Sequence, residues 1–266
     1  MTTTISIESS QNAFFKTLKH LADSVQRRRE KGQTLLDGEH LIEAYLAGGS
    51  CPIRLLVTDN QALIHWQTRC PQVPISVLTP QLLSALSPVK TPSGVMALIA
   101  IPTGIHLPAP HFSVLLEHIQ DPGNLGAMLR SAAAAGVNTV YLSEGCADVW
   151  SPKVLRGGMG AHFSLHLVER ADLAVIAAEF SGTVYSTALN AHHSLYECNL
   201  TGHVAFAFGN EGAGLSSDLR AATHQAVRIP MPGRMESLNA AAALAICLFE
   251  RVRQTGGGSV RQYQKQ

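Results

Sequence analysis

The second half of the chain alternates short apolar runs with segments of helical periodicity. The apolar runs predict strands, and the periodic segments between them predict helices. The expected strands are 114–119, 139–142, 183–188, 204–208 and 226–229, and the expected helices are 125–135, 173–180, 219–222 and 238–253. Apolar strands that alternate with helices are typical of a mostly parallel sheet covered on both faces. In such a sheet, ligands bind at the carboxyl ends of the strands.

The first hundred residues predict a smaller α/β domain. Apolar residues from Phe15 to Val25 recur at helical spacing, which indicates a helix over 12–29. Further expected strands are 34–36, 53–58, 75–78 and 95–101, and further expected helices are 39–47 and 80–85. We therefore expect a first domain over 12–101, a stiff proline-containing linker over 102–111, a second domain over 112–255 and a disordered tail over 256–266.

Composition narrows the class of protein. The 266 residues are 46% hydrophobic, as in an ordinary globular protein of two domains. No apolar run approaches the ~18 residues that suggest a membrane span, and the N-terminus lacks a signal-peptide pattern. We expect a cytoplasmic protein without a membrane partner. The five cysteines form no Cys-x-x-Cys pair, and the twelve histidines form no His-x-x-x-His or Glu-flanked pair on one predicted helix, so neither disulfides nor a metal are predicted.

Charge gives an ambiguous signal for nucleic acid. A net charge of +1 argues against binding by bulk electrostatics. Basic residues nevertheless gather in the first predicted helix and the turn after it, namely Lys16, Lys19, Arg27, Arg28, Arg29 and Lys31. Arg27, Arg28 and Arg29 are the candidates for phosphate contacts. A solvated helix face explains the same pattern, and both interpretations stay open.

Three segments in the second half have the composition of ligand loops. Residues 121–130 (DPGNLGAMLR), 206–216 (FAFGNEGAGLS) and 229–239 (IPMPGRMESLN) each follow or continue an apolar strand and are broken by glycine or proline. Glycine permits close approach of a ligand to the backbone. The spacing Gly209-x-x-Gly212-x-Gly214 differs from the dinucleotide fingerprint, and there is no Gly-Lys-Ser/Thr loop and no Gly-x-Ser-x-Gly elbow.

In this order, the three segments resemble the signature motifs of the SpoU (TrmH-like) family of SPOUT RNA methyltransferases. The resemblance covers residues 113–253. It implies transfer of a methyl group from S-adenosylmethionine to a ribose 2′-hydroxyl, on a mostly parallel SPOUT sheet that ends in a C-terminal trefoil knot. Residues 35–44 and 91–97 resemble the small ribosomal-protein-like α/β RNA-binding domain that often precedes this fold. Asp37 stands where that domain more often has Glu.

The resemblance also implies roles for individual residues. Cofactor contacts are expected from Gly209, Ile229, Leu238, Thr187, Asn210 and Met231. Catalytic roles are expected from Arg130, Glu211, Ser237 and Asn239, with Asn124 facing the RNA. A guanidinium stays protonated, so we expect Arg130 to hold a phosphate or the developing alkoxide, with the proton passing elsewhere. Two structural alternatives stay open: Ser237 as a helix N-cap, and Arg130 paired with a helix carboxylate.

The sequence departs from the family pattern at one point in the third segment. The family usually has Asn-Val-Ser where this chain has Asn239-Ala240-Ala241. No role for a hydroxyl at position 241 carries over, whereas Asn239 is unaffected.

The leading functional prediction is an rRNA 2′-O-methyltransferase that acts as a homodimer. The family places Arg130 of one subunit near the cofactor of the other. A tRNA methyltransferase is the enzymatic alternative, although the N-terminal domain favours rRNA by analogy. An idle RNA-binding or ribosome-assembly protein is the alternative from another class. The sequence keeps all four expected catalytic residues, Arg130, Glu211, Ser237 and Asn239, which argues against an idle protein.

Overall fold

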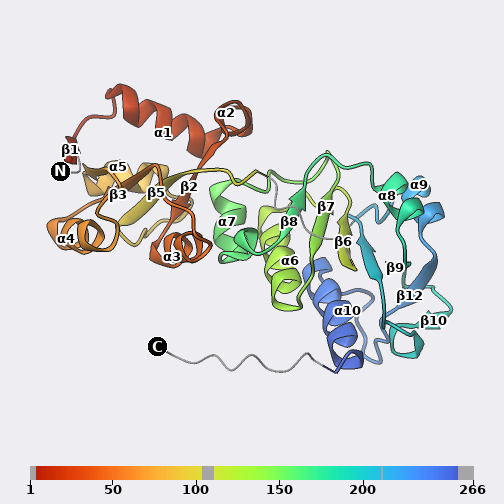
Figure 1. The fold of residues 1–266 in the computed structure, drawn as a ribbon. Coiled ribbons are helices and arrows are strands. Elements are labelled where there is room, and N and C mark those ends of the chain that lie inside the picture. Colours follow the sequence, from red (N-terminus) through yellow and green to blue (C-terminus); the bar gives the residue numbers. More distant parts are fainter. Residues whose placement is uncertain (1–3, 104–110, 211, 257–266) are drawn as a thin grey trace. The chain divides into compact units, whose positions relative to one another are not determined.

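The computed structural model describes residues 4–103, 111–210 and 212–256, which form two compact units (Figure 1). The first unit takes residues up to 105 together with 148–164, and the second takes 106–147 and 165–266. Most of the expected linker, the expected tail after residue 256, and Glu211 lie outside the described residues.

The first unit is built on a five-stranded mixed sheet of order β1-β4-β3-β5-β2. β1, β4 and β3 run parallel, and β5 pairs antiparallel with both β3 and β2. Its elements are β1 (Thr4–Ile7), α1 (Ala13–Asp23), α2 (Val25–Lys31), β2 (Gln33–Asp37), α3 (Glu39–Ala47), β3 (Arg54–Val57), α4 (Asn60–Arg69), β4 (Ile75–Leu78), α5 (Pro80–Leu86), β5 (Val95–Ala100), α7 (Pro152–Gly158) and the 3₁₀ turn η1 (Ala161–Phe163). Buried residues of α1, α5 and the strands form one core.

The helix expected over 12–29 is in fact two helices. Ser24 ends α1 by donating its backbone N–H to His20, and its side chain accepts from the N–H of Arg27 to cap α2. Gly32 ends α2 in the left-handed conformation, at φ 59°. Val25, the first residue of α2, continues the helical spacing of the apolar residues in α1. For this reason the sequence predicted a single helix.

The first unit also takes in chain that the predicted boundaries leave out. β1 pairs with β4, so the sheet begins before residue 12. Residues 148–164 return from the second half of the sequence: the hydroxyl of Thr34 donates to the carbonyl of Trp150 at 2.7 Å, and the rings of Tyr45 and Phe163 lie 5.2 Å apart. Such distant pairings leave no local periodic signal.

The second unit contains a seven-stranded sheet of order β10-β12-β9-β11-β6-β7-β8, in which every strand pair is parallel. Its elements are β6 (Phe112–Leu116), α6 (Pro122–Ala134), β7 (Thr139–Leu142), β8 (His166–Val168), α8 (Leu173–Glu179), β9 (Thr183–Thr187), β10 (His193–Ser194), the 3₁₀ turn η2 (Leu195–Glu197), β11 (Val204–Phe208), α9 (Ser217–Ala222), β12 (Gln225–Arg228) and α10 (Ala240–Gln254). The expected parallel α/β sheet is confirmed.

Strands β6 and β11 are buried along their whole length, as expected for the centre of a sheet covered on both faces. Helix α10 packs against α6 (Figure 1). The three glycine- and proline-broken segments follow β6, β11 and β12, so the parallel direction brings them to the same edge of the sheet. Among the described residues, no helix is long and apolar enough to cross a membrane.

Candidate active site

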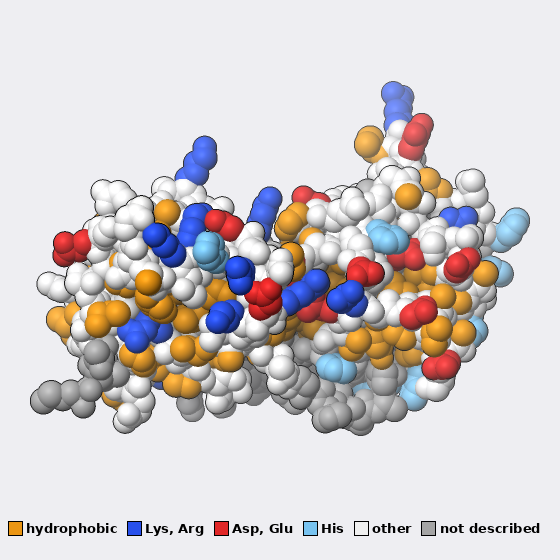
Figure 2. All heavy atoms as spheres, turned by 90° about the horizontal axis from the view of Figure 1, so that it is seen from above, with side chains coloured by type: hydrophobic (Ala, Val, Ile, Leu, Met, Phe, Trp, Pro, Cys, Tyr) orange, Lys and Arg blue, Asp and Glu red, His pale blue; other side chains and the backbone are white. Residues whose placement is uncertain are grey.

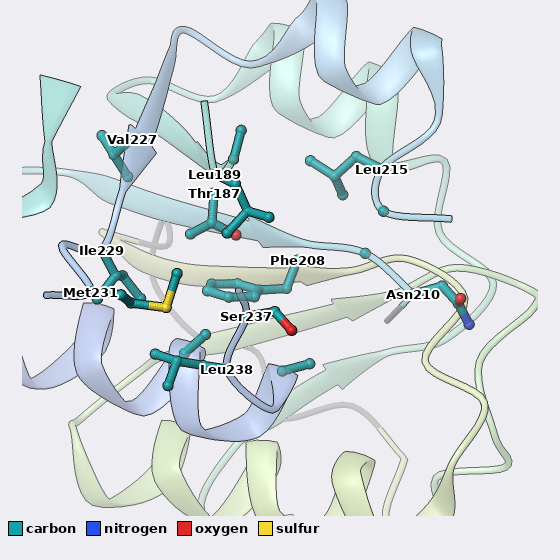
Figure 3. Close-up of a pocket in the computed structure, with 15 residues that line it drawn as sticks. Thr187, Leu189, Phe208, Asn210, Leu215, Val227, Ile229, Met231, Ser237 and Leu238 are labelled. Carbon is teal, nitrogen blue, oxygen red and sulfur yellow. The ribbon is translucent and has the colours of Figure 1, made fainter. Parts of the chain in front are cut away.

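A pocket of about 210 Å³ opens at the carboxyl ends of β9, β11 and β12, beside the start of α10 (Figure 3). Its lining comes from Thr187, Ala188, Leu189, Phe208, Gly209, Asn210, Gly214, Leu215, Val227, Ile229, Met231, Ser237, Leu238, Ala240 and Ala243. Most of these side chains are apolar, and the polar groups are few. This composition is that of a small-molecule site with apolar walls and a few orienting groups.

All six residues expected to contact a cofactor line this pocket: Gly209, Ile229, Leu238, Thr187, Asn210 and Met231. The side chains of Ile229, Met231 and Leu238 lie beside the ring of Phe208, while Asn210 lies on the opposite side of the view (Figure 3). The pocket thus combines an apolar wall with loop backbone that could hydrogen-bond an adenine ring.

The loop after β11 depends on glycine at position 209. A Cβ atom there would lie 2.2 Å from the carbonyl oxygen of Gly214 and 2.6 Å from the nitrogen of Leu215. The loop folds back on itself, since the N–H of Gly214 donates to the carbonyl of Asn210 at 2.8 Å. Only a residue without a side chain allows this close approach.

Asn210 fixes the turn of this loop through its side chain. Its Oδ1 accepts from the N–H groups of Gly212 and Ala213 at 2.9 and 3.2 Å. Its Nδ2 donates to the carbonyl of His118 at 3.2 Å. The amide therefore joins the loop after β11 to the end of β6.

The first and third segments meet through Asn124 and Asn239. Asn239 is the N-cap of α10, because its Oδ1 accepts from the N–H groups of Ala241 and Ala242. Its Nδ2 donates to Oδ1 of Asn124 at 2.9 Å. The alternative role of Ser237 as N-cap of this helix is therefore wrong. Ser237 instead lines the pocket and is exposed.

Arg130 lies on α6 and is exposed to solvent. Within the described part of the chain, Arg130 forms no ion pair with a carboxylate. The alternative of a salt bridge to a helix carboxylate is therefore wrong for these residues. Arg130 does not line the pocket itself. Its expected companion Glu211 lies outside the described residues.

The structure corrects the prediction that Arg28 contacts RNA. The Arg28 side chain is only 5% exposed, and its Nε donates to Oδ2 of Asp148 at 2.6 Å. Its Nη1 donates to the carbonyls of Leu21 and Ala22. Arg28 therefore secures residues 148–164 to α2. Arg27 and Arg29 are exposed, with Arg27 2.9 Å from Glu30, and Figure 2 shows basic side chains over this unit interspersed with acidic ones.

Several residues of the site were not predicted, among them Leu189, Phe208 and Leu215 in the pocket wall, and Glu117, which contacts the loop after β11. Glu117 is 7% exposed at the end of β6, and its carboxylate accepts from both the N–H and the hydroxyl of Ser216, each at 2.7 Å. For Glu117, the available signal was a carboxylate within the mostly apolar run 112–119. A buried carboxylate requires such partners.

Metal and disulfide chemistry receive no support from the parts of the chain that are described. No group of three or more His, Cys, Asp and Glu side chains is arranged there to hold a metal ion. All five cysteines are free, and burial raises the pKa of Cys247 to about 12. Cys247 is therefore an apolar core residue.

Comparison with known proteins places this chain in a family. The model of the SpoU rRNA Methylase family matches residues 111–249. An uncharacterized tRNA/rRNA methyltransferase of Synechocystis is 33% identical over 264 residues, which span 96% of each chain. The 23S rRNA (guanosine(2553)-2′-O)-methyltransferase RlmP of Bacillus subtilis is 34% identical over 252 residues, 91% of this chain and 97% of the relative.

Solved structures agree with this placement. The SpoU methyltransferase AviRb from Streptomyces viridochromogenes, solved in complex with the cofactor AdoMet, superposes with a TM-score of 0.83 at 28% identity, over 94% of this chain and 100% of that one. An RNA 2′-O ribose methyltransferase superposes with a TM-score of 0.79 at 30% identity, over 94% and 99%. The fold and the resemblance of the three segments are thereby confirmed, and the chain belongs to the SpoU rRNA methylase family.

Proposed function

We propose that this protein transfers a methyl group from S-adenosylmethionine to a ribose 2′-hydroxyl of rRNA. The observation that carries the proposal is the convergence of three separate segments on one edge of the sheet. The second segment, 206–216, forms the pocket together with the third, 229–239. The first and third segments are joined by the hydrogen bond between Asn124 and Asn239. A cofactor pocket and a polar, RNA-facing rim would thus lie side by side.

The pocket fits the proposed cofactor by its chemistry. Adenine requires flat apolar walls and in-plane backbone hydrogen bonds. Ile229, Leu238 and Met231 supply the apolar wall, and the backbone of Gly209 and Gly214 lies along the pocket. S-adenosylmethionine would supply an activated methyl group. The AviRb structure, which contains AdoMet in a related fold, supports this assignment.

Arg130, Ser237 and Asn239 would act on the RNA side of the pocket, together with Glu211. Arg130 would hold the target phosphate or the developing alkoxide, because its permanent charge suits stabilisation rather than proton removal. Ser237 and Asn239 would orient the ribose. Asn124 would present its side chain to the RNA from the start of α6.

An rRNA substrate is favoured by the relatives. The RlmP relative, which spans nearly the whole chain, is named for 23S rRNA, and several shorter matches are named as 23S rRNA methyltransferases of the RlmB type. The Synechocystis relative is named for tRNA or rRNA, so tRNA stays the second candidate. Mapping of ribose methylation in RNA from cells with and without this protein separates them. Loss of a 2′-O-methyl group from rRNA is expected, and loss from tRNA alone would favour the alternative.

Homodimerisation, the trefoil knot and a cytoplasmic location complete the proposal. For the dimer, Phe249 of α10 is 48% exposed and offers apolar surface for a second copy. Mixing Arg130→Ala chains with Asn239→Ala chains tests whether sites are shared between subunits. Some activity should return through one intact composite site, whereas a strictly monomeric active enzyme would refute the shared site.

A further inference from the structure

We infer that Glu117 is a positioning residue, which holds the loop 209–216 in the form that binds the cofactor. The inference rests on the proposed function. Glu117 does not line the pocket itself. Glu117 instead contacts both ends of the loop 209–216, which lines the pocket.

The start of the loop is fixed by backbone. The N–H of Glu117 donates to the carbonyl of Phe208 at 2.8 Å, which is the last ladder bond between β6 and β11. One residue further along, the carbonyl of His118 accepts from the Asn210 side chain. Both bonds place the first residues of the loop against the end of β6.

The end of the loop is fixed by the Glu117 carboxylate. Its Oε2 accepts from the N–H of Ser216 and its Oε1 from the Ser216 hydroxyl, both at 2.7 Å. Ser216 in turn caps α9 by accepting from the N–H of Leu219. Because the carboxylate is charged and buried, these bonds are of the strong charge-assisted kind.

Between the two anchors lie four residues of the pocket wall, Gly209, Asn210, Gly214 and Leu215. The strand end alone holds one side of this loop, and the carboxylate holds the other. Removal of the carboxylate takes away both of these bonds. Because Ser216 is an exposed residue, its N–H and hydroxyl then bond to water, and this end of the loop is released from β6. The cofactor would then bind only the fraction of molecules with a closed loop.

The test is calorimetric titration of S-adenosylmethionine into the full-length wild type and into Glu117→Leu and Glu117→Gln. If the closed fraction falls to about a tenth in Glu117→Leu, the apparent Kd rises about tenfold. Gln can accept from the Ser216 N–H and should restore most of the affinity. In methyl transfer, KM for the cofactor should rise while kcat at saturation stays near that of the wild type.

Two controls separate positioning from stability. Glu250 is equally buried in the same unit, and its carboxylate accepts from Arg253 and Gln254, not from the loop. Glu250→Leu should lower the melting temperature and leave the cofactor Kd unchanged. If Glu117→Leu does not fold, Ser216→Ala replaces it: it should raise the Kd several-fold, whereas Asp172→Ala, which removes the cap of α8, should not.

Each outcome is decisive. A folded Glu117→Leu, or Ser216→Ala, with wild-type affinity for the cofactor overturns the positioning role, as does a Glu250→Leu variant that loses affinity equally. Failure of the wild type itself to bind S-adenosylmethionine would instead refute the proposed function.

Discussion

Asn239 donates a hydrogen bond from Nδ2 to Oδ1 of Asn124 at 2.9 Å, although the two residues are 115 positions apart in the sequence. Asn239 begins α10 and Asn124 lies in the first turn of α6. The contact therefore joins the first and third ligand segments at the point where the helices pack. A single amide carries two tasks, because the Oδ1 of Asn239 also caps α10.

This division of tasks gives a first prediction. Asn239→Ala removes the cap and the contact, so it should cost about 1 kcal/mol of stability and lower methyl transfer. Asn124→Ala leaves the cap intact, so it should lower transfer with a smaller loss of stability. Urea unfolding and single-turnover methylation measure the two effects.

The double variant provides the control. If one shared contact carries the catalytic effect, the double variant should transfer methyl groups no more slowly than Asn239→Ala. Effects on the rate that simply multiply would show that the two side chains act independently.

The second prediction concerns the basic cluster. Arg28→Ala leaves the carboxylate of Asp148, which is 12% exposed, without its charged partner, and should destabilise the protein by about 3 kcal/mol or more. Arg27→Ala is the matched control, since exposed pairs contribute at most about 1 kcal/mol. Denaturant unfolding of both variants measures the difference, and equal stability would contradict the assigned role of Arg28.

For RNA binding, substitution of the exposed arginines should have the larger effect and substitution of the buried Arg28 the smaller one. If the exposed residues Arg27 and Arg29 contact RNA phosphates, the double variant Arg27→Ala/Arg29→Ala should bind RNA more weakly. The slope of log binding constant against log salt concentration should fall by roughly one unit per lost contact. Filter binding over a salt series measures the slope. An unchanged slope would show that the cluster is a solvated helix face.

Gly209→Ala gives a third prediction. The added Cβ would lie 2.3 Å from the carbonyl carbon of Gly214, so the loop must open and cofactor binding should be lost. Gly212→Ala is the control in the same loop, because its Cβ would have nothing nearer than Asn210 Oδ1 at 3.4 Å. Titration with S-adenosylmethionine compares them, and comparable binding by both variants would show that the loop is not held in this form.

The fourth prediction concerns pH. Complete burial lowers the pKa of His162 to about 4, and its Nε2 contacts the carbonyl of Val149 at 2.9 Å. The unfolded chain binds this proton with a pKa near 6.5, so the stabilisation is present above that pH and is lost as pH falls towards 4. Between pH 7 and 5 the folded state should lose about 2 kcal/mol through this group.

His162→Gln cannot take up that proton. Its unfolding free energy should therefore fall less steeply between pH 7 and 5 than that of the wild type, when both are measured by urea titration. Parallel pH profiles would contradict the low pKa of His162.

Local patterns were sufficient to predict the parallel sheet and the edge at which its ligand loops gather, whereas the pocket residues were predicted from the resemblance to the family. Gly209 and Ile229 directly follow β11 and β12, and strand ends of a parallel sheet share one edge. What the patterns could not supply was pairing over long distances. The approach of Trp150 to Thr34, the burial of Arg28 against Asp148 and the anchoring of Ser216 by Glu117 each join positions about a hundred residues apart.

A local ambiguity explains the assignment of the N-cap. Ser237 and Asn239 are both good capping residues, and the sequence does not show at which of them helical geometry begins. The structure shows α10 beginning after Asn239, which leaves Ser237 in the pocket wall.

The central claim, methylation of a ribose in rRNA, is tested most directly by incubating the purified protein with RNA from cells that lack it and with S-adenosylmethionine carrying a deuterated methyl group. Digestion to nucleosides and mass spectrometry then locate the label. We predict one labelled 2′-O-methylnucleoside in the rRNA fraction, which disappears with Arg130→Ala. Label on a base, or no label in any RNA despite saturable binding of the cofactor, would contradict the account.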